Sequence, residues 1–379
     1  MSFFDSKILI KRRKNVLILP VNTGGTILYI KEALIELGYQ TRILTFVKHP
    51  YCYKSDYTIF NQGDCFFQKE IKKIISLKHL IYSRYVIYNY GRTIFFPEIN
   101  EKKGIYRMLK SLYNYYLRIM RIVEISLNKI FNNQIIFIFS GDDARLKKYC
   151  IKNYDISPAH FLYKSGYYSD LKDNLKIKNI NFVDRIADNI FALNPDILNT
   201  LPNRSIFLAY PYKNNNNYRI HSYSNDLLKI LHMPSNRDFK GTYFIKKTID
   251  ELKLLNYNIE FKIIENESND KLLKIICNYD LVIDQLLAGW YGSVAVESMS
   301  MGIPVMAYIR NLDLKYIPRE MSNELPIINV NINNLKEQIV KYANLSINEK
   351  LEISKSSYKF SKKWHSIKKC KDLFKNNLK

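Results

Sequence analysis

The sequence predicts an α/β protein built as two successive domains, each a doubly wound parallel sheet, that face each other across a central cleft. Its 379 residues are too many for one core of ordinary size and suit two. Apolar runs of strand length alternate with helix-periodic segments, which is typical of parallel sheets covered by helices on both faces. A polar, asparagine-rich stretch at 211–226 interrupts this alternation, which then restarts.

The first half predicts a domain over residues 1–211. Its first apolar run, 15–21, leads through an Asn-Thr-Gly-Gly-Thr turn into a helical segment that ends at Gly38. A helix signal this soon after a buried strand indicates a strand–helix–strand unit. Further strands are expected at 40–46, 85–90, 135–140, 189–193 and 205–210.

The second half repeats the pattern over residues 212–345. A helix is expected at 242–256, where apolar residues recur at helical spacing. Strands are expected at 227–234, 259–265, 281–285 and 304–309. The last segment, 346–379, is helical and basic, and we expect it to pack back towards the first domain. Ligands of doubly wound sheets bind beyond the carboxyl ends of the strands, which here means the cleft between the domains.

The composition favours a folded protein with an anionic partner. Hydrophobic residues make up 47% of the chain, enough to bury two cores, and the formal net charge is +23. Such a charge favours nucleic acid, an acidic membrane surface or a phosphorylated substrate. The abundance of Lys, Asn, Ile and Tyr offers a simpler explanation for part of the charge, namely solvated basic faces.

The cysteines and the apolar runs indicate a reducing, cytoplasmic location. Five cysteines occur, and no two have the C-x-x-C spacing of a zinc site. The N-terminal stretch has no signal-peptide pattern, because a basic run interrupts its apolar residues. No run of about 18 apolar residues exists, so no membrane-spanning helix is expected. Neither a metal nor a cofactor is predicted.

Within the stretch 284–309, which opens with Asp284, Glu297 is the one carboxylate among otherwise apolar and glycine-flanked residues. The buried strand before it ends in a loop with Gly289 and Gly292, and a helix is expected from about Ser293. Glycines let backbone approach a ligand closely, and a helix N-terminus attracts a diphosphate. A carboxylate one turn into the helix can accept two hydrogen bonds from the cis-diol of a ribose. The alternative is that Glu297 supports the helix start, but a capping box would place it three residues after the cap.

A cationic element follows the first strand of the second half. Arg237 and Lys240 lie three residues apart in a loop that leads to the helix at 242–256. With Gly241 and the helix start, they are predicted to clamp a diphosphate and to neutralise the charge that grows when a sugar–phosphate bond breaks. In so basic a chain two cations alone carry little weight, and the prediction depends on their occurring together with the glycine turn.

Together these residues resemble a known family. The segments NRDFKGT (236–242) and DQLLAGWYGSVAVESMSMGIPV (284–305) are similar to the nucleotide-binding domain of GT-B glycosyltransferases, specifically the family 4 (group 1) class. The resemblance implies the GT-B fold, two Rossmann-like domains around a cleft. It also implies a nucleotide-diphosphate sugar whose diphosphate is held by Arg237 and Lys240 and whose ribose is bound by Glu297. The implied enzyme is a hexosyltransferase that retains anomeric configuration.

The sequence departs from the family pattern at one position. Many members carry a second glutamate eight residues before the first, usually in contact with the donor sugar, and here that position is Gly289. Asp284 or Gln285, at the end of the strand, is expected to take over contacts with the sugar. Donor-binding residues are thus predicted at Gly241, Asp284, Gln285, Gly289, Gly292, Ser293 and Glu297.

The first half is predicted to bind the acceptor. Gly24 and Gly25, between the first strand and the first helix, would bring backbone N–H groups to the cleft, although an ordinary tight turn explains them equally well. A Gly-x-Asp-x-Arg segment after a later strand is similar to one found at this place in related transferases. Asp142 or Asp143 in it is expected either to bond an acceptor hydroxyl or to cap the next helix, with Arg145 at the cleft edge.

Residues 101–131 form a basic and aromatic-rich helical segment. Seven Lys or Arg stand against two Glu, and apolar residues interleave at helical spacing. Such a helix can lie on an anionic membrane, here the cytoplasmic face of the inner membrane, and bring the enzyme to a lipid-linked acceptor. A helix that covers the sheet and keeps a solvated basic face is the equally weighted alternative.

The sequence therefore predicts a metal-independent glycosyltransferase that moves a sugar from a nucleotide-diphosphate sugar to a cell-surface glycan or lipid-linked acceptor, as in bacterial capsule or lipopolysaccharide synthesis. No D-x-D triplet occurs, which disfavours the metal-dependent class, and Arg237 and Lys240 would supply the positive charge. One alternative is another GT-B activity such as a sugar-nucleotide epimerase, which needs no acceptor. Another is nucleic-acid binding, for which no RNP, KH, zinc-finger or helix-turn-helix signature is found.

Overall fold

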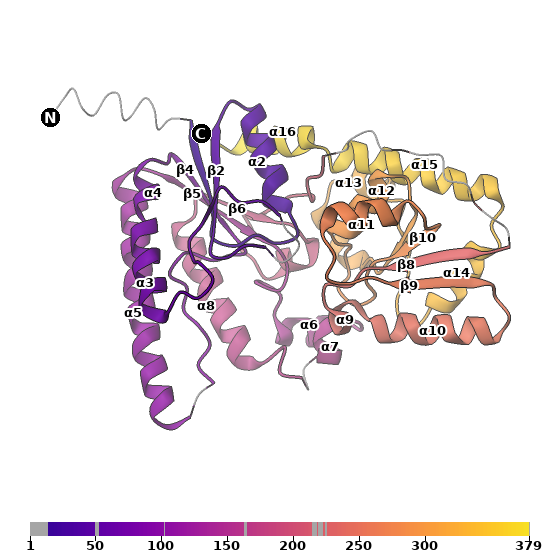
Figure 1. Cartoon of the computed structure of the whole chain (residues 1–379), viewed down its shortest axis with the longest axis horizontal. Helices are drawn as coiled ribbons and strands as arrows, with labels where there is room; N and C mark the ends of the chain where they lie inside the picture. Colours follow the sequence, from indigo (N-terminus) through magenta and orange to yellow (C-terminus); the bar gives the residue numbers. More distant parts are fainter. Residues whose placement is uncertain are drawn as a thin grey trace.

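The protein has two lobes, each built around an all-parallel sheet (Figure 1). The computed structural model describes residues 14–49, 53–101, 103–162, 165–213, 218, 223 and 226–378. Strands and helices alternate along both lobes, and the two-sheet α/β prediction is confirmed.

The first sheet has seven strands in the order β3-β2-β1-β4-β5-β6-β7, and every neighbouring pair is parallel. From β1 the chain adds β2 and β3 on one side of β1, and then β4 and the later strands on the other side of β1. This reversal creates a switch point beyond the carboxyl ends of β1 and β4. The strands are β1 (Asn15–Leu19), β2 (Gln40–Thr45), β3 (Tyr57–Thr58), β4 (Tyr85–Asn89), β5 (Gln134–Phe139), β6 (Asn189–Ala192) and β7 (Ile206–Phe207).

Residues of β1 alternate between the two faces of the first sheet. Leu17 and Leu19 belong to a core cluster that includes residues of α5 (Gly104–Ile130) and α8 (Asp170–Ile186). Val16 and Ile18 point to the other face, because successive strand side chains alternate. That face is covered by α2 (Thr26–Glu36) and α16 (Ile367–Asn377), which lie side by side (Figure 1). The lobe's other helices are α3 (Phe66–Ser76), α4 (Lys78–Ile81), α6 (Lys147–Asn153), α7 (Pro158–Leu162) and the 3-10 helix η1 (Pro195–Asn199).

The second sheet has five parallel strands in the order β12-β11-β10-β8-β9, with its switch point between β8 and β10. Its strands are β8 (Leu228–His232), β9 (Ile259–Ile263), β10 (Leu281–Ile283), β11 (Val305–Ala307) and β12 (Ile328–Asn329). One face packs against α12 (Ser293–Ser300) and α15 (Ile347–Trp364), and the other against α10 (Thr242–Leu254) and α14 (Leu335–Ala343). The remaining helices are α9 (Arg237–Lys240), α11 (Asn269–Ile276), η2 (Asn311–Tyr316) and α13 (Arg319–Asn323).

The chain crosses between the lobes a second time near its C-terminus. Phe360 and Trp364 of α15 belong to the core of the second lobe, whereas Cys370 and Phe374 of α16 are buried against the first sheet. His365 joins the two helices, and its ring bonds the carbonyl of Tyr210 at 2.8 Å. The last helix is therefore a part of the first lobe's core.

Two features differ from the sequence-based expectations. The two-residue strands β3 and β12 were not predicted, and β7 spans only 206–207 of the expected 205–210, because strands this short show no readable alternation. Most of the predicted linker at 211–226 lies outside the described residues. No helix among the described residues combines the length and the apolar character needed to cross a bilayer.

The burial of Phe374 predicts that α16 stabilises the first lobe. Phe374 is fully buried and contacts Phe191 of β6, with ring centroids 5.3 Å apart. We expect Phe374→Ala to lower the free energy of unfolding by about 3–5 kcal/mol in urea titrations, because a large aromatic side chain leaves a cavity. Phe67→Ala, which truncates an exposed phenylalanine of α3, is the matched control and should change it little. Equal losses in both variants would contradict this role of α16.

Candidate functional site

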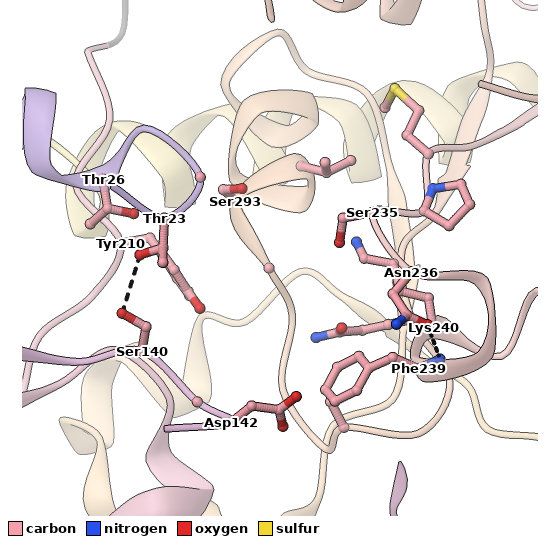
Figure 2. A pocket seen from close by; sticks show the side chains of 18 of the residues that line it. Thr23, Thr26, Ser140, Asp142, Tyr210, Ser235, Asn236, Phe239, Lys240 and Ser293 are labelled. Carbon is pink, nitrogen blue, oxygen red and sulfur yellow. Dashed lines mark hydrogen bonds between the residues drawn. The ribbon is translucent and has the colours of Figure 1, made fainter. Parts of the chain in front are cut away.

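A pocket of about 330 Å³ lies between the two lobes, where the carboxyl ends of both sheets face each other (Figure 2). Thr23, Ser140 and Tyr210 approach it from the first lobe, and Ser235, Asn236 and Lys240 from the second. Each of these residues follows a strand, as expected for ligand sites of doubly wound sheets. The pocket therefore lies in the cleft that the sequence predicted.

Eight of the predicted site residues line this pocket, and six do not. The lining residues are Gly24, Asp142, Arg145, Lys240, Gln285, Gly292, Ser293 and Glu297. The predicted residues outside the lining are Gly25, Asp143, Arg237, Gly241, Asp284 and Gly289. The contacts described below give a physical reason for each placement.

The turn after β1 brings the first lobe close to the start of α12. Gly24 and Gly25 both have positive φ, +57° and +72°, which is unfavourable for residues with a Cβ. A Cβ on Gly24 would lie 3.3 Å from Oγ of Ser293, across the cleft. A Cβ on Gly25 would overlap the ring of Tyr53 at 2.5 Å. Gly24 thus allows the lobes to approach, and Gly25 makes room for a tyrosine of the pocket lining.

The two neighbouring aspartates after β5 have different surroundings. Asp143 accepts backbone N–H groups of Ser140 at 2.9 Å and Gly141 at 2.7 Å, so it closes the turn and does not cap the helix, which begins only at Lys147. Burial raises the pKa of Asp143 to about 6 despite these bonds. Asp142 lines the pocket instead and accepts the hydroxyl of Tyr168 at 2.6 Å and that of Tyr167.

Arg145 holds this side of the pocket in a fixed geometry. Its guanidinium forms a two-pronged pair with Asp196, at 2.7 and 3.1 Å, and its third nitrogen donates to Asp142 at 2.8 Å. Burial alone would raise the pKa of Asp142, but the charge of Arg145 keeps it below its usual value. Asp142 is therefore ionised and oriented before any ligand enters.

Glu297 points into the pocket from the second turn of α12. Its side chain is buried, and its Oε1 accepts a hydrogen bond from Asn269 Nδ2 at 2.9 Å. This bond crosses to α11, so the carboxylate does not form a capping box with its own helix. Burial raises the pKa of Glu297 to about 7, while Asn269 and Lys240 act in the opposite direction. A buried carboxylate with unused acceptor capacity is suited to a ligand with hydroxyl donors.

Lys240 is tied to the start of the same helix through Asp284. The ammonium of Lys240 forms an ion pair with Asp284, whose other oxygen accepts the backbone N–H of Gly292 at 2.6 Å. Asp284 is buried beneath the lining, which explains why it supports the pocket and does not reach it. A Cβ on Gly292 would lie 4.0 Å from Nζ of Lys240. A cation and the N-terminus of α12 thus meet on one side of the pocket.

The structure does not bring Arg237 into the pocket with Lys240. The expected loop is a one-turn helix, α9, and the side chain of Arg237 is 60% exposed. Its Nε lies 2.9 Å from both carboxylate oxygens of Glu265, which itself lines the pocket. Gly241 ends α9 with φ +78°, and its missing Cβ leaves space for Leu286.

The space beside Gly289 is filled by an arginine from elsewhere in the chain. It has φ +84°, and a Cβ there would lie 2.4 Å from the guanidinium of Arg310. Arg310 pairs with Asp313 at 2.8 Å and donates to the carbonyl of Ile156 in the first lobe at 2.9 Å. The space that a side chain at position 289 would need is thus occupied by a buried cation that connects the lobes. Gln285 lines the pocket, and its amide donates to the carbonyl of Trp290.

Sequence reasoning missed several residues of the lining. Asn269 and Asn236 lie after β9 and β8, and the rule that ligands bind beyond strand ends would have found both. Asn236 accepts the N–H of Phe239 at 2.9 Å and so caps α9. His232, which ends β8, bonds Ile283 and Thr242 through its two ring nitrogens, and burial lowers its pKa to about 4. Within the described ranges, no three His, Cys, Asp or Glu side chains gather as metal ligands.

Comparisons with known proteins identify the fold. No family model matches the sequence, and a search of curated proteins finds no match. Sucrose-phosphate synthase from Thermosynechococcus elongatus is 13% identical with a TM-score of 0.57, covering 96% of this chain and 98% of that one. HepE from Anabaena, in complex with UDP and glucose, is 10% identical with a TM-score of 0.54 over 96% and 99%. WaaG, a glycosyltransferase involved in lipopolysaccharide biosynthesis, is 11% identical with a TM-score of 0.53 over 95% and 99%. The chain therefore has the GT-B fold, as the resemblance implied.

The raised pKa of Glu297 predicts a pH dependence of stability. An unfolded chain ionises this residue near its usual 4.5 and the native state near 7, so the native state binds the proton more tightly. Stability is therefore lost as pH rises through this window. As the pH rises from 5 to 8, we expect the free energy of unfolding of Glu297→Gln to increase by about 2–3 kcal/mol relative to that of the wild type. Urea unfolding at each pH measures this difference. Glu260→Gln, an exposed carboxylate of β9, is the control and should show no such gain. A pH-independent difference for Glu297→Gln would disprove the shift.

Proposed function

We propose that the protein is a glycosyltransferase that moves a sugar from a nucleotide-diphosphate sugar to a glycan or lipid-linked acceptor. The observation that carries this proposal is the meeting of Glu297, Lys240 and the N-terminus of α12 on one side of the pocket. A ribose needs a hydroxyl acceptor, and a diphosphate needs cations and free N–H groups; this side offers both. The GT-B fold adds support, since HepE of that fold holds UDP and glucose.

In the proposed complex, the ribose, the diphosphate and the sugar of the donor each contact different residues of the pocket. Glu297 accepts hydrogen bonds from the ribose diol, beside Asn269. The diphosphate lies at Gly292 and Ser293, where the backbone N–H groups of the helix start and Lys240 oppose its charge. The sugar then reaches towards Gln285 on the second lobe and Asp142 on the first. Asp284 takes part by holding Lys240 and Gly292, and not by contact with the sugar.

The acceptor enters from the first lobe in this scheme. Asp142 lines the pocket as an ionised and oriented carboxylate that can accept a hydrogen bond from an acceptor hydroxyl. Asp143 is held by backbone N–H groups and keeps the turn in shape. The proposed acceptor is a cell-surface glycan or lipid-linked precursor; WaaG, which shares the fold, is involved in lipopolysaccharide biosynthesis.

The proposed reaction is metal-independent and retains anomeric configuration. The bond between the anomeric carbon and the diphosphate oxygen breaks as the acceptor oxygen approaches on the same face. The proton of the acceptor hydroxyl passes to the departing diphosphate oxygen, and no protein nucleophile is needed. Lys240 and the start of α12 stabilise the negative charge that grows on the diphosphate.

A panel of nucleotide-diphosphate sugars tests the assignment. A ligand that binds only the native state raises the melting temperature, so the matching donor should stabilise the protein, and the corresponding nucleoside diphosphate should do so in part. Turnover of that donor should then require an acceptor. Efficient conversion of the donor without an acceptor would favour an epimerase, and absence of stabilisation by every nucleotide would refute the donor site.

Substitutions in the second lobe distinguish the roles of Lys240 and Arg237 in donor binding. We expect Lys240→Ala to weaken binding of the donor by about tenfold or more, because the diphosphate loses its nearest charge. Arg237→Ala is the matched control and should weaken it less than about threefold, because Arg237 is exposed and paired with Glu265. Affinity is measured by calorimetry.

A double variant tests whether Lys240→Ala weakens donor binding only because it destabilises the protein. Removal of Lys240 leaves Asp284 buried and unpaired, so Lys240→Ala/Asp284→Asn should recover stability but not donor affinity. Recovery of affinity as well would show that Lys240 acts only through folding.

Donor affinity should also depend on pH through Glu297. The ionised carboxylate accepts both ribose hydroxyls, and its pKa is about 7 without ligand. Affinity for the nucleotide should therefore rise between pH 6 and pH 8 in the wild type. Glu297→Gln should bind about tenfold more weakly at pH 8 and lose this rise. The same pH profile in both proteins would exclude contact between Glu297 and the ribose.

A further inference from the structure

The outer side of the first lobe carries an apolar stripe on a helix that also has a buried face. On α5, six apolar residues follow one another at intervals of three and four and are each 44–65% exposed: Ile105, Met108, Leu112, Tyr115, Ile119 and Ile122. Residues at this spacing share one face of a helix. The buried residues Leu117, Glu124 and Asn128 lie on the opposite face. The core therefore does not account for the stripe.

Helix α3 carries an exposed apolar face of its own. Its side chains Phe66, Phe67, Ile71 and Ile75 are more than half exposed. The two helices pack side by side, because the ring of Phe66 lies 5.2 Å from that of Tyr113 on α5 (Figure 1). Between them runs a groove of about 560 Å³. We call these exposed residues of α3 and α5 the α3–α5 surface. Exposed apolar side chains gathered on one helix face, as on α5, mark a site of interaction.

Basic residues form a row along one edge of the stripe. Arg107, Arg118 and Lys129 are eleven residues apart, which is close to three helical turns, so they lie almost in line. Each is exposed, and none forms an ion pair with a residue that the structure describes. The single acidic residue of α5, Glu124, is buried and accepts the backbone N–H groups of Ile94 and Phe95. The exposed part of α5 thus carries cations without acids.

We infer that the α3–α5 surface docks onto an anionic phospholipid bilayer. An apolar stripe beside a basic row is the pattern of a helix that lies in the plane of the membrane interface. A second copy of the chain fits less well, because a two-fold pairing would set one basic row against another with no acid on α5 to compensate. Nucleic acid would match the cations but leave the isoleucine and leucine side chains exposed to water. This inference is independent of the transfer reaction.

The α5 helix is long enough to anchor the protein in this way. Its 27 residues extend about 40 Å. In the docked state its stripe enters the boundary between headgroups and acyl chains, with Arg107, Arg118 and Lys129 at the lipid phosphates. Lys69 of α3 lines the groove and is a further exposed cation of this part of the lobe. The two paired lysines of the groove, Lys73 and Lys110, are held by Glu70 and Glu98.

Co-sedimentation of the full chain with vesicles tests this inference. We expect binding to vesicles that contain phosphatidylglycerol together with phosphatidylcholine, weak binding to phosphatidylcholine alone, and loss of binding as salt is raised. Arg107→Gln/Arg118→Gln/Lys129→Gln and, separately, Leu112→Ser/Ile119→Ser should each weaken the binding by about tenfold or more. Both variants alter exposed residues only, so their melting temperatures should stay unchanged.

A matched variant removes the same charge elsewhere. Lys246→Gln/Lys247→Gln/Lys253→Gln neutralises three exposed lysines of α10 in the second lobe and should leave vesicle binding almost unchanged. Equal loss in this control would show that only net charge matters and would overturn the inference. So would absence of wild-type binding to the anionic vesicles. A dimer in analytical ultracentrifugation that Leu112→Ser/Ile119→Ser dissociates would assign the surface to a second copy instead.

Discussion

The buried ion pair between Lys240 and Asp284 is the interaction on which the rest of the site depends. A carboxylate buried as deeply as Asp284 is costly unless it is paired and hydrogen-bonded, and here Lys240 and the N–H of Gly292 meet both needs. The pair connects the end of β10, the helix α9 and the start of α12. It thereby fixes a cation beside a helix N-terminus, the combination that a diphosphate requires.

The other polar residues in and around the pocket fall into two groups. Some use their hydrogen-bonding groups within the protein, and others keep acceptor capacity that the protein does not use. Asp143, outside the lining, and Arg145, in the lining, are held by hydrogen bonds within the protein, so they shape the pocket. Glu297 accepts one bond from Asn269, and its burial raises its pKa. Under the proposed function, the energetic cost of burying this carboxylate would be offset by hydrogen bonds from the hydroxyl groups of the ligand.

The two lobes contact each other at more than one place, and these contacts hold the two sides of the pocket together. Arg310 of the second lobe reaches the carbonyl of Ile156 in the first, and Asn199 donates to Asp313 at 2.9 Å. The C-terminal helices connect the lobes on another side, with α15 in one core and α16 in the other. The space at Gly289 is thus filled by Arg310, a residue that holds the lobes together.

The sequence by itself determined the two parallel sheets, the cleft and the position of Glu297. Buried parallel strands must be apolar, and a glycine turn before a short helix leaves a lone carboxylate few places to point. Only the tertiary structure decided which of Asp142 and Asp143 lines the pocket, because adjacent residues of a turn look alike in sequence. It also decided that Arg237 pairs with Glu265, and that Arg310 takes the space at Gly289, since both partners are distant along the chain. Helical spacing showed that α5 is amphipathic. Which of its apolar faces is buried depended on the lobe that packs against it.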